Sequence, residues 1–462
     1  MVITDFCVKR INLENIVDNN SDSEARVIYT LLMALPDNFD KIKIFTIILN
    51  GIFSTFHYDY TKSSIKFNQR PYFKLLYTFI YLFHEFPNNA IVLGGDNTKI
   101  KYICLIAQFL KFLSPQYYPG FALAWLELIS SENFMSCFLG DVNPQIIYEE
   151  EKTDIIPDYL SLISELFIFL KKCSNNEANK IFMDYVHKYI YLLCETYPEF
   201  IIENYYILIT ELSYENICIQ LKNLLLSTIP KKFGHFENIN FEDKDLESEL
   251  NKNTLGDYDM EISSNIINCL RRCNILTYID KYIENPNFNF VKNLCENFNR
   301  KKENINFNFF IMQCLVIYYG FNSLKKNKKI SESYNFFLNM MKLLDMETRI
   351  ILMISLLNQL RFPSNQTLYF LLIMLNILTN INNEEIEEIF ISLLLERLFV
   401  KPIPWGIILL FKKVLKGNIY DLMNTNYFKN LKGGKGFINK LKEFLENKNL
   451  VKFINIGDDE IN

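Results

Sequence analysis

The residue types that most often carry chemistry are spread thinly through this sequence. It contains 10 cysteines and 4 histidines, but no CxxC pair, and the histidines lie far apart. Only Cys269 and Cys273 are close, four residues apart on a segment that we expect to be helical. Zinc sites draw their ligands from closely spaced Cys and His residues. The spacing therefore predicts no metal and no cofactor, and it indicates reduced, buried thiols in a protein of the cytoplasm or the nucleus.

Motifs of known enzyme classes do not appear either. The glycine-rich strings 94–96 and 432–436 lack the spacing of a phosphate-binding loop, and neither GxSxG nor HExxH occurs. The acidic pairs 384–385 and 387–388 fall on the start and the solvent face of one expected helix. Two-metal chemistry needs carboxylates that converge from separate elements. We therefore expect a protein that is not an enzyme.

Composition favours a helical protein with a large core. Of 462 residues, 50% are hydrophobic and 22% are charged, which is enough apolar material to exclude a disordered chain. Only 14 glycines and 13 prolines are present, fewer than sandwiches with many turns or glycine-rich nucleotide folds usually need. The net charge of −5 excludes nucleic-acid binding through a global positive field.

Apolar residues recur at helical spacing through most of the chain. In residues 386–398 they follow one face of a helix, with Asn382 and Asn383 as cap candidates and glutamates in the first turn. A second clear case is 181–193, which Tyr197-Pro198 terminates. The helical stretches are joined by short polar connections without a fixed period. This pattern predicts an all-α fold, an irregular HEAT-like helical repeat (α-solenoid) in two halves.

We expect the chain to be organised as an N-terminal HEAT-like half (1–233), an acidic connection (234–308), a C-terminal HEAT-like half (309–420) and a peripheral tail (421–462). Residues 234–262 carry nine acidic residues against two lysines. They form either a solvated linker or an acidic docking strip. The charge-free stretch 362–383 has too short an apolar part to span a bilayer, so it predicts a buried core helix and no membrane partner.

Seven strings are far more informative than the composition. In chain order they are FNQRPYF (67–73), YPGFALAWLELIS (118–130), YPEF (197–200), IQLKNLLLS (219–227), NQLRFP (358–363), LLERL (394–398) and PIPWG (402–406). Together they resemble the C-terminal homology domain of the large scaffold subunit, Not-one, of the CCR–NOT mRNA deadenylase complex. The blocks follow the family's order and cover residues 42–417, whereas 234–308 matches poorly.

The resemblance implies a HEAT-like domain without catalytic residues. It implies partners of two kinds: the smaller subunits Not-two and Not-three/five, bound through their extended anchor regions, and RNA-binding adaptor proteins. The implied role is mRNA deadenylation, mRNA decay and translational repression. In the family, upstream sections of a much longer scaffold dock the deadenylase. This sequence begins only a short way before the matching domain, so we expect contact with a deadenylase only indirectly.

Some residues within these strings have two readings each. Asn358 and Gln359 end a helix before Arg361-Phe362-Pro363, where their amides either cap loose carbonyls or, with these three neighbours, meet an extended partner peptide. Either Glu396 or Arg397 could form a structural ion pair with a neighbouring helix, or it could contact a partner. The partner-binding candidates are Asn358, Gln359, Arg361, Phe362 and Pro363. The structural candidates are Arg70, Pro71, Trp125 (a core anchor), Glu127, Glu396, Arg397 and Trp405.

A different class of protein, an RNA-binding helical solenoid without a link to a deadenylase, remains the alternative. It would need a contiguous Lys/Arg stripe on one face and salt-sensitive binding. The basic strings 300–302 and 325–326 are short and lie among asparagines, which favours solvated loops.

Overall fold

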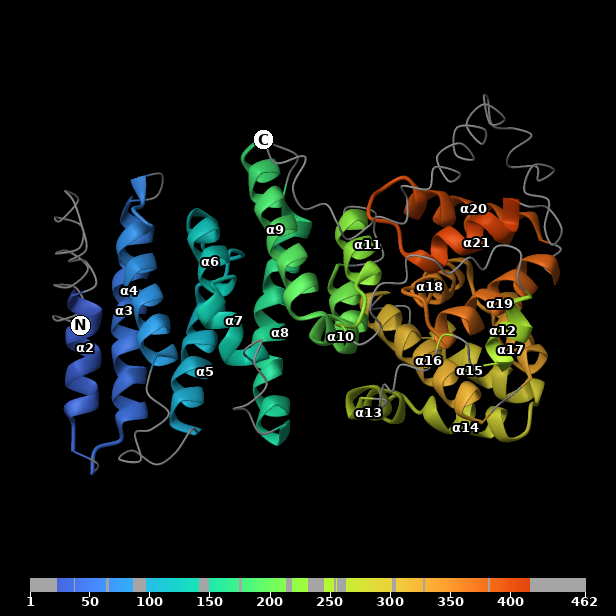
Figure 1. The fold of residues 1–462 in the computed structure, drawn as a ribbon, viewed down its shortest axis with the longest axis horizontal. Helices are drawn as coiled ribbons and strands as arrows, with labels where there is room; N and C mark the ends of the chain where they lie inside the picture. The colour runs from blue at the N-terminus through green and yellow to red at the C-terminus, as the bar shows by residue number, and fades with distance from the viewer. Residues whose placement is uncertain are drawn as a thin grey trace. The chain divides into compact units, whose positions relative to one another are not determined.

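The structure is a computed structural model. It describes residues 23–36, 38–63, 66–85, 97–140, 149–173, 177–212, 218–231, 245–252, 255, 263–300, 305–326, 329–380 and 383–415. Every regular element within these ranges is a helix (Figure 1), which confirms the all-α fold class. The chain forms two compact units that divide between Tyr189 and Ile190, inside helix α9. We refer to them as the first and the second unit.

Helices of the first unit stand side by side (Figure 1). They are α2 (Ser23–Ala34), α3 (Lys41–Ser63), α4 (Arg70–His84), α5 (Asn97–Phe112), α6 (Ala122–Ile129), α7 (Glu132–Leu139), α8 (Glu149–Lys172) and the beginning of α9 (Glu177–Thr196). α2 packs on α4, α3 on α5, and α5 on α8. Aromatic rings fill the space between them. Phe45 on α3 makes edge-to-face contacts with Phe79, Phe83 and Tyr102 at centroid distances of 5.5, 5.1 and 5.4 Å.

Trp125 on α6 is the core anchor that the sequence predicted. It is fully buried, and its indole Nε1–H donates to the Leu110 carbonyl at 2.8 Å. This hydrogen bond satisfies the ring's polar group inside an apolar environment.

Replacing Trp125 with alanine is expected to lower the free energy of unfolding of the first unit by about 3–5 kcal/mol, because it leaves a large cavity and an unpaired carbonyl. Leu123→Ala is the matched control on the same helix, since Leu123 is half exposed. It should cost no more than about 0.5 kcal/mol. Urea unfolding followed by far-UV circular dichroism measures both; equal costs would contradict the assignment of Trp125 to the core.

The second unit contains the remaining helices. They are α10 (Pro198–Glu211), α11 (Ile219–Ser227), α12 (Leu246–Asn251), α13 (Ser264–Arg272), α14 (Leu276–Glu284), α15 (Phe288–Arg300), α16 (Ile305–Lys325), α17 (Ile330–Leu343), α18 (Met346–Leu357), α19 (Asn365–Asn380), α20 (Glu384–Leu398) and α21 (Trp405–Leu415). α16 packs against α10, α13, α18 and α19 and so occupies the centre. Its Gly320 allows close approach, since a Cβ there would collide with the Phe370 ring of α19.

Among the described helices, residues 307–325 of α16 are long and apolar enough to cross a membrane by length and composition, but 67% of this segment is buried inside the protein. It is therefore a core helix. The prediction of a buried helix in 362–383 is confirmed by α19, whose apolar residues are buried. The cap prediction for α20 is confirmed as well: the Asn383 side chain accepts the backbone N–H of Glu385 at 3.0 Å. Asn382 lies outside the described residues.

Domain organisation differs from the expected one. The compact units divide at residue 189, whereas the sequence placed the first boundary at 233. Within the expected connection 234–308, residues 263–300 form α13, α14 and α15. α13 packs on α16 and α15 on α17, because their apolar residues are buried there. Most of the acidic segment 234–262, and all of the tail 421–462, lie outside the described residues.

Candidate partner-binding site

The five residues nominated for partner binding lie in the turn between α18 and α19. Asn358 caps α18, with its N–H donating to the Ile354 carbonyl at 2.9 Å. Ser364 directly precedes α19, and its Oγ accepts the N–H of Thr367 in the first turn at 3.2 Å. The Thr367 hydroxyl in turn donates to the Phe362 carbonyl at 2.8 Å. Side chains within the turn thus satisfy the backbone groups that two helix ends leave open.

Gln359 and Arg361 attach this turn to α10. The Tyr205 hydroxyl donates to Gln359 Oε1 at 2.8 Å, and the Arg361 guanidinium lies 3.9 Å from the centroid of the Tyr205 ring. Burial raises the pKa of Tyr205, although the positive charge of Arg361 acts in the opposite direction. The arrangement is a buried cation–π contact supported by a hydrogen bond.

Arg397 of α20 joins two other elements through asparagine side chains. Its Nη2 donates to Asn358 Oδ1 at 2.8 Å and its Nη1 to Asn223 Oδ1 at 3.3 Å. The Asn223 amide donates back to the carbonyls of Arg397 at 2.9 Å and Val400 at 2.7 Å. Burial lowers the pKa of Arg397 to about 10, so the guanidinium stays charged at neutral pH. Arg397 and Asn358, both nominated from the sequence, are therefore direct partners.

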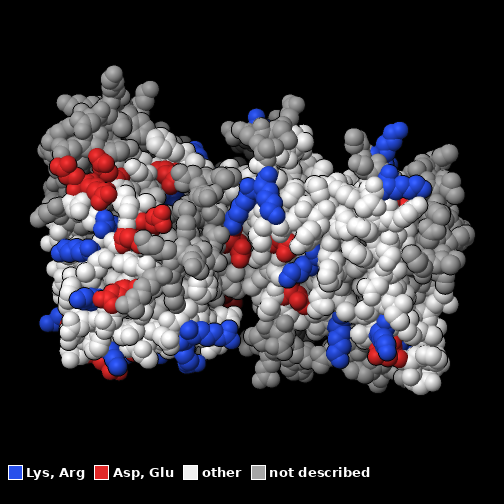
Figure 2. All heavy atoms as spheres, turned by 180° about the vertical axis from the view of Figure 1, so that it is seen from behind, with Lys and Arg blue, Asp and Glu red and all other residues white. Residues whose placement is uncertain are grey.

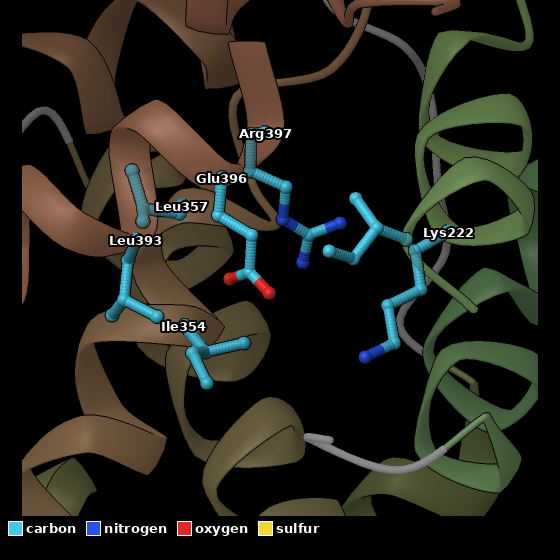
Figure 3. Close-up of a pocket in the computed structure, with 7 residues that line it drawn as sticks. Lys222, Ile354, Leu357, Leu393, Glu396 and Arg397 are labelled. Carbon is cyan, nitrogen blue, oxygen red and sulfur yellow. The ribbon is translucent and has the colours of Figure 1, made fainter. Parts of the chain in front are cut away.

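A small cavity lies beside Arg397. Lys222, Glu396 and Arg397 point into it, and Ile354, Leu357 and Leu393 contribute its apolar wall (Figure 3). The cavity volume is about 10 Å³, which holds at most a single water molecule. Such a site is too small for a metabolite or a cofactor. Glu396 Oε1 is buried and has no hydrogen-bond partner, and burial raises the pKa of this carboxyl despite the nearby positive charges.

Glu396→Gln tests this electrostatic environment. The pKa of Glu396 is higher in the folded chain than in the unfolded chain. As the pH rises, this carboxyl therefore ionises more readily in the unfolded chain, which lowers the stability of the folded state. The wild type should therefore lose stability relative to Glu396→Gln as the pH rises from about 4 to about 7. Urea unfolding at both pH values measures the difference. Glu127→Gln, at an exposed position, is the control. If the difference in stability between the wild type and Glu396→Gln were the same at both pH values, the burial of this carboxyl would be contradicted.

The partner-binding reading of the five turn residues needs correction. Asn358, Gln359, Arg361 and Phe362 are at most 4% exposed, and Pro363 is buried too. Contacts within the second unit cover them, so an extended peptide has no access in this structure. The structural alternative for Asn358 and Gln359 is the one that the geometry favours. Arg397 is buried inside the unit as well, where it bonds Asn358 and Asn223, and Lys222 of the neighbouring helix α11 lines the same cavity as Glu396.

The other signature residues lie at helix starts or on a helix surface. Arg70 is the exposed first residue of α4, and Pro71 occupies its first turn. Glu127 is exposed on α6. Trp405 begins α21, where the N–H of the next residue, Gly406, donates to the Arg361 carbonyl at 2.9 Å. A Cβ on Gly406 would lie 2.9 Å from backbone atoms of Leu360, so only glycine permits this approach.

Cys269 and Cys273, the closest cysteine pair in the sequence, meet a third thiol. Cys314 on α16 is hydrogen-bonded to Cys269, and this bond, together with burial, raises the pKa of Cys314 well above its usual range. A raised pKa disfavours the thiolate that metal binding and nucleophilic attack require. In the described part of the chain no group of three or more His, Cys, Asp or Glu side chains could hold a metal ion.

Comparison with known proteins identifies the family. The family described as "CCR4-Not complex component, Not1" matches residues 83–442, most of the chain. The chain belongs to the Not1 family. It is 26% identical over 413 residues to the CCR4-NOT transcription complex subunit let-711 of Caenorhabditis elegans, covering 84% of this chain and 15% of the worm protein. It is 23% identical over 439 residues to the General negative regulator of transcription subunit 1 of Saccharomyces cerevisiae, covering 86% and 20%.

Solved structures of Not1 domains share the fold. The NOT1 superfamily homology domain from Chaetomium thermophilum superposes with a TM-score of 0.76 at 17% identity, covering 96% of this chain and 88% of that one. A Not1 C-terminal domain in complex with Not4 gives a TM-score of 0.73 at 20% identity, covering 95% and 90%. The family resemblance stated from the seven strings is thereby confirmed.

Three residues that complete the turn were not singled out from the sequence. Tyr205, Lys222 and Asn223 form the α10 and α11 side of this site. Lys222 and Asn223 belong to the string 219–227, but neither its spacing nor its composition connects them with Arg397. Asn223 and Arg397 are 174 residues apart, a separation at which no local pattern indicates a contact.

Proposed function

We propose that this chain is a non-enzymatic scaffold segment of the CCR4–NOT complex. It binds the smaller subunits Not-two and Not-three/five through their extended anchor regions, together with RNA-binding adaptor proteins. It contacts a deadenylase only indirectly, and it supports mRNA deadenylation, mRNA decay and translational repression. The observation that carries the proposal is the Not1 family match over residues 83–442.

The fold agrees with such a role. A related domain of the same fold was solved in complex with Not4. Helical repeats present long side-by-side surfaces, and extended segments that order on binding can follow such surfaces over more than the roughly 1,600 Å² of a standard interface. The turn that contains Phe362 is buried and does not contact partners itself. It supports the binding surface by fixing the packing of α18, α19 and α21.

Affinity purification of the tagged chain from its own cells, followed by quantitative mass spectrometry, tests the proposal. We expect both smaller Not subunits, with a deadenylase in smaller amount. A Phe362→Glu variant is the control, since loss of the second unit's fold should remove the partners. Recovery of the Not subunits without a deadenylase would remove the link to poly(A) shortening. Recovery of neither Not subunit would contradict the scaffold role.

The alternative, direct RNA binding, is tested in the same material. Ultraviolet cross-linking of the chain to RNA after the partners are stripped, with a steep loss of binding as salt increases, would favour an RNA-binding solenoid. We expect no such cross-link.

We further propose that the protein acts in the cytoplasm and the nucleus. The cysteines of the described residues are free thiols, as expected in a reducing compartment. Fluorescent tagging tests the location, and a signal confined to a secretory compartment would contradict it.

A further inference from the structure

Helices α3 and α5 of the first unit leave large aromatic side chains in solvent. Phe112, the last residue of α5, is 66% exposed, and Tyr117 in the turn that follows is 68% exposed. On α3, Tyr58 is 59% exposed. Leaving rings in water forfeits the free energy of their burial, and contiguous apolar patches on a folded domain mark interaction sites.

Ring contacts join Phe53 of α3 to Phe112 at the end of α5 and to Tyr118 in the turn that follows. The Phe53 ring of α3 lies 6.4 Å from the Phe112 ring of α5 and 6.4 Å from the Tyr118 ring, measured between centroids. The Tyr118 hydroxyl lies 2.9 Å from Nδ1 of His57 on α3. The backing of the patch is therefore fixed before any partner arrives, which lowers the entropic cost of binding. We define the aromatic patch as Phe53, His57, Phe112 and Tyr117, with the buried Tyr118 behind it.

Lysines lie on the two helices that carry the patch. Exposed lysines on the same two helices are Lys43, Lys62, Lys101 and Lys111. The only carboxylate on these helices is Asp59, and it already accepts the Tyr72 hydroxyl at 2.6 Å. None of the described carboxylates forms an ion pair with Lys43, Lys101 or Lys111. From behind, the first unit shows a broad uncharged area, with Lys or Arg side chains and some acidic ones toward its edges (Figure 2).

From this combination we propose that the aromatic patch docks an acidic peptide segment of another protein, with leucine or aromatic side chains as anchors. The anchors pack on Phe112 and Tyr117, and Asp or Glu side chains of the peptide pair with the flanking lysines. Opposite charges steer the encounter, and the buried rings supply most of the affinity. This inference rests on the proposed scaffold function and names one surface and one partner chemistry for it.

Aliphatic side chains on the same two helices favour a peptide over single-stranded RNA. Ile47 on α3 is 62% exposed, and Leu105 on α5 is half-buried. Branched aliphatic side chains provide no flat face on which nucleobases stack, whereas they pack well against leucine. All cationic side chains on α3 and α5 are lysines. These helices contain no arginine, whose planar guanidinium binds phosphate through two hydrogen bonds at once.

Fluorescence anisotropy with the purified full chain tests the proposal. The first probe is a labelled synthetic peptide with leucine and phenylalanine at helical spacing and Asp or Glu elsewhere. The second is the same peptide with every acidic residue replaced by lysine, and the third is a labelled single-stranded RNA. We expect binding of the acidic peptide alone, weakened when NaCl is raised from about 0.05 to about 0.5 M.

Variants locate the binding surface. Combined Phe112→Ala and Tyr117→Ala substitutions should weaken the acidic peptide by about tenfold or more, as for other aromatic anchors. Lys111→Glu should weaken binding of the acidic peptide and reduce the preference for it over the lysine peptide. Tyr185→Ala on α9 is the matched control, since Tyr185 is 52% exposed in the same unit, and it should leave binding unchanged. Far-UV circular dichroism confirms that all variants remain folded.

Each other outcome overturns the proposal. Binding of RNA in place of the acidic peptide would make the patch a nucleic-acid surface. Binding of no probe, or peptide binding that the Phe112 and Tyr117 substitutions leave unchanged, would show that the patch does not dock such a peptide. Co-purification of the smaller Not subunits, measured on the same samples, separates this failure from a failure of the proposed function.

Discussion

Phe362→Glu is expected to unfold the second unit. The Phe362 side chain is 2% exposed, and the Arg361 guanidinium lies 5.1 Å from its ring centroid. Truncating a buried phenylalanine costs about 3–5 kcal/mol, and a buried carboxylate adds several more. The sum is comparable with the total stability of a typical domain, about 5–15 kcal/mol. Far-UV circular dichroism and a urea titration should show the loss of helical signal from this unit.

Phe288→Glu is the matched control for this experiment. Phe288 begins α15 in the same unit and is 50% exposed, so a carboxylate there remains in water. The substitution should change the free energy of unfolding by no more than about 0.5 kcal/mol. A folded Phe362→Glu protein that had lost only a partner would instead return Phe362 to the partner-binding surface.

Arg397→Ala is expected to destabilise the second unit by about 3–5 kcal/mol. The guanidinium donates hydrogen bonds to Asn358 and Asn223, and its removal leaves both amide oxygens unpaired in the interior. Unpaired buried acceptors bear their full desolvation cost, and the deleted side chain leaves a cavity next to Glu396. Thermal unfolding and urea titration measure the effect.

Two further substitutions separate the charge from its geometry. Arg397→Lys keeps the charge but lacks the planar fork that reaches two asparagines, so it should recover only part of the stability. Arg272→Ala removes an exposed arginine at the end of α13 and should be close to neutral. If Arg397→Ala were as mild as Arg272→Ala, the hydrogen bonds to Asn358 and Asn223 would contribute nothing to stability.

Long periodic helices were the part of the fold that the sequence predicted well. The residues of α20 follow one apolar face over four turns, and Asn383 caps them as expected. Trp125 was correctly placed in the core, because a large apolar ring among leucines has few other locations. Local patterns of this kind depend only on neighbours within a few turns.

Helix α14 was missed because it is short. It has nine residues and buries only Ile279, Tyr282 and Ile283. A periodic signal over so few residues, placed among asparagines and charges, does not stand out. Packing against α16 stabilises this helix in the folded chain. Tertiary contacts, and not local propensity, therefore decide its structure.

The sequence singled out several residues of the turn but did not decide what they contact. The structure places Asn358, Gln359 and Arg397 in buried hydrogen bonds around this turn. Whether they face a partner or the interior depends on Tyr205 and Asn223, which are 154 and 174 residues away from the side chains that they bond. Amides at a helix end are compatible with both arrangements, so only the three-dimensional structure distinguishes them.

Direct assembly from purified components is the measurement that bears most closely on the scaffold function. The chain is mixed with the anchor regions of Not-two and Not-three/five from the same cells and analysed by size-exclusion chromatography with light scattering. We predict one co-eluting complex that contains all three chains, and no complex with the Phe362→Glu variant, while the Phe288→Glu variant behaves as the wild type. Separate elution of the folded wild-type chain and both anchor regions would contradict the assignment of this protein as a Not1-type scaffold segment.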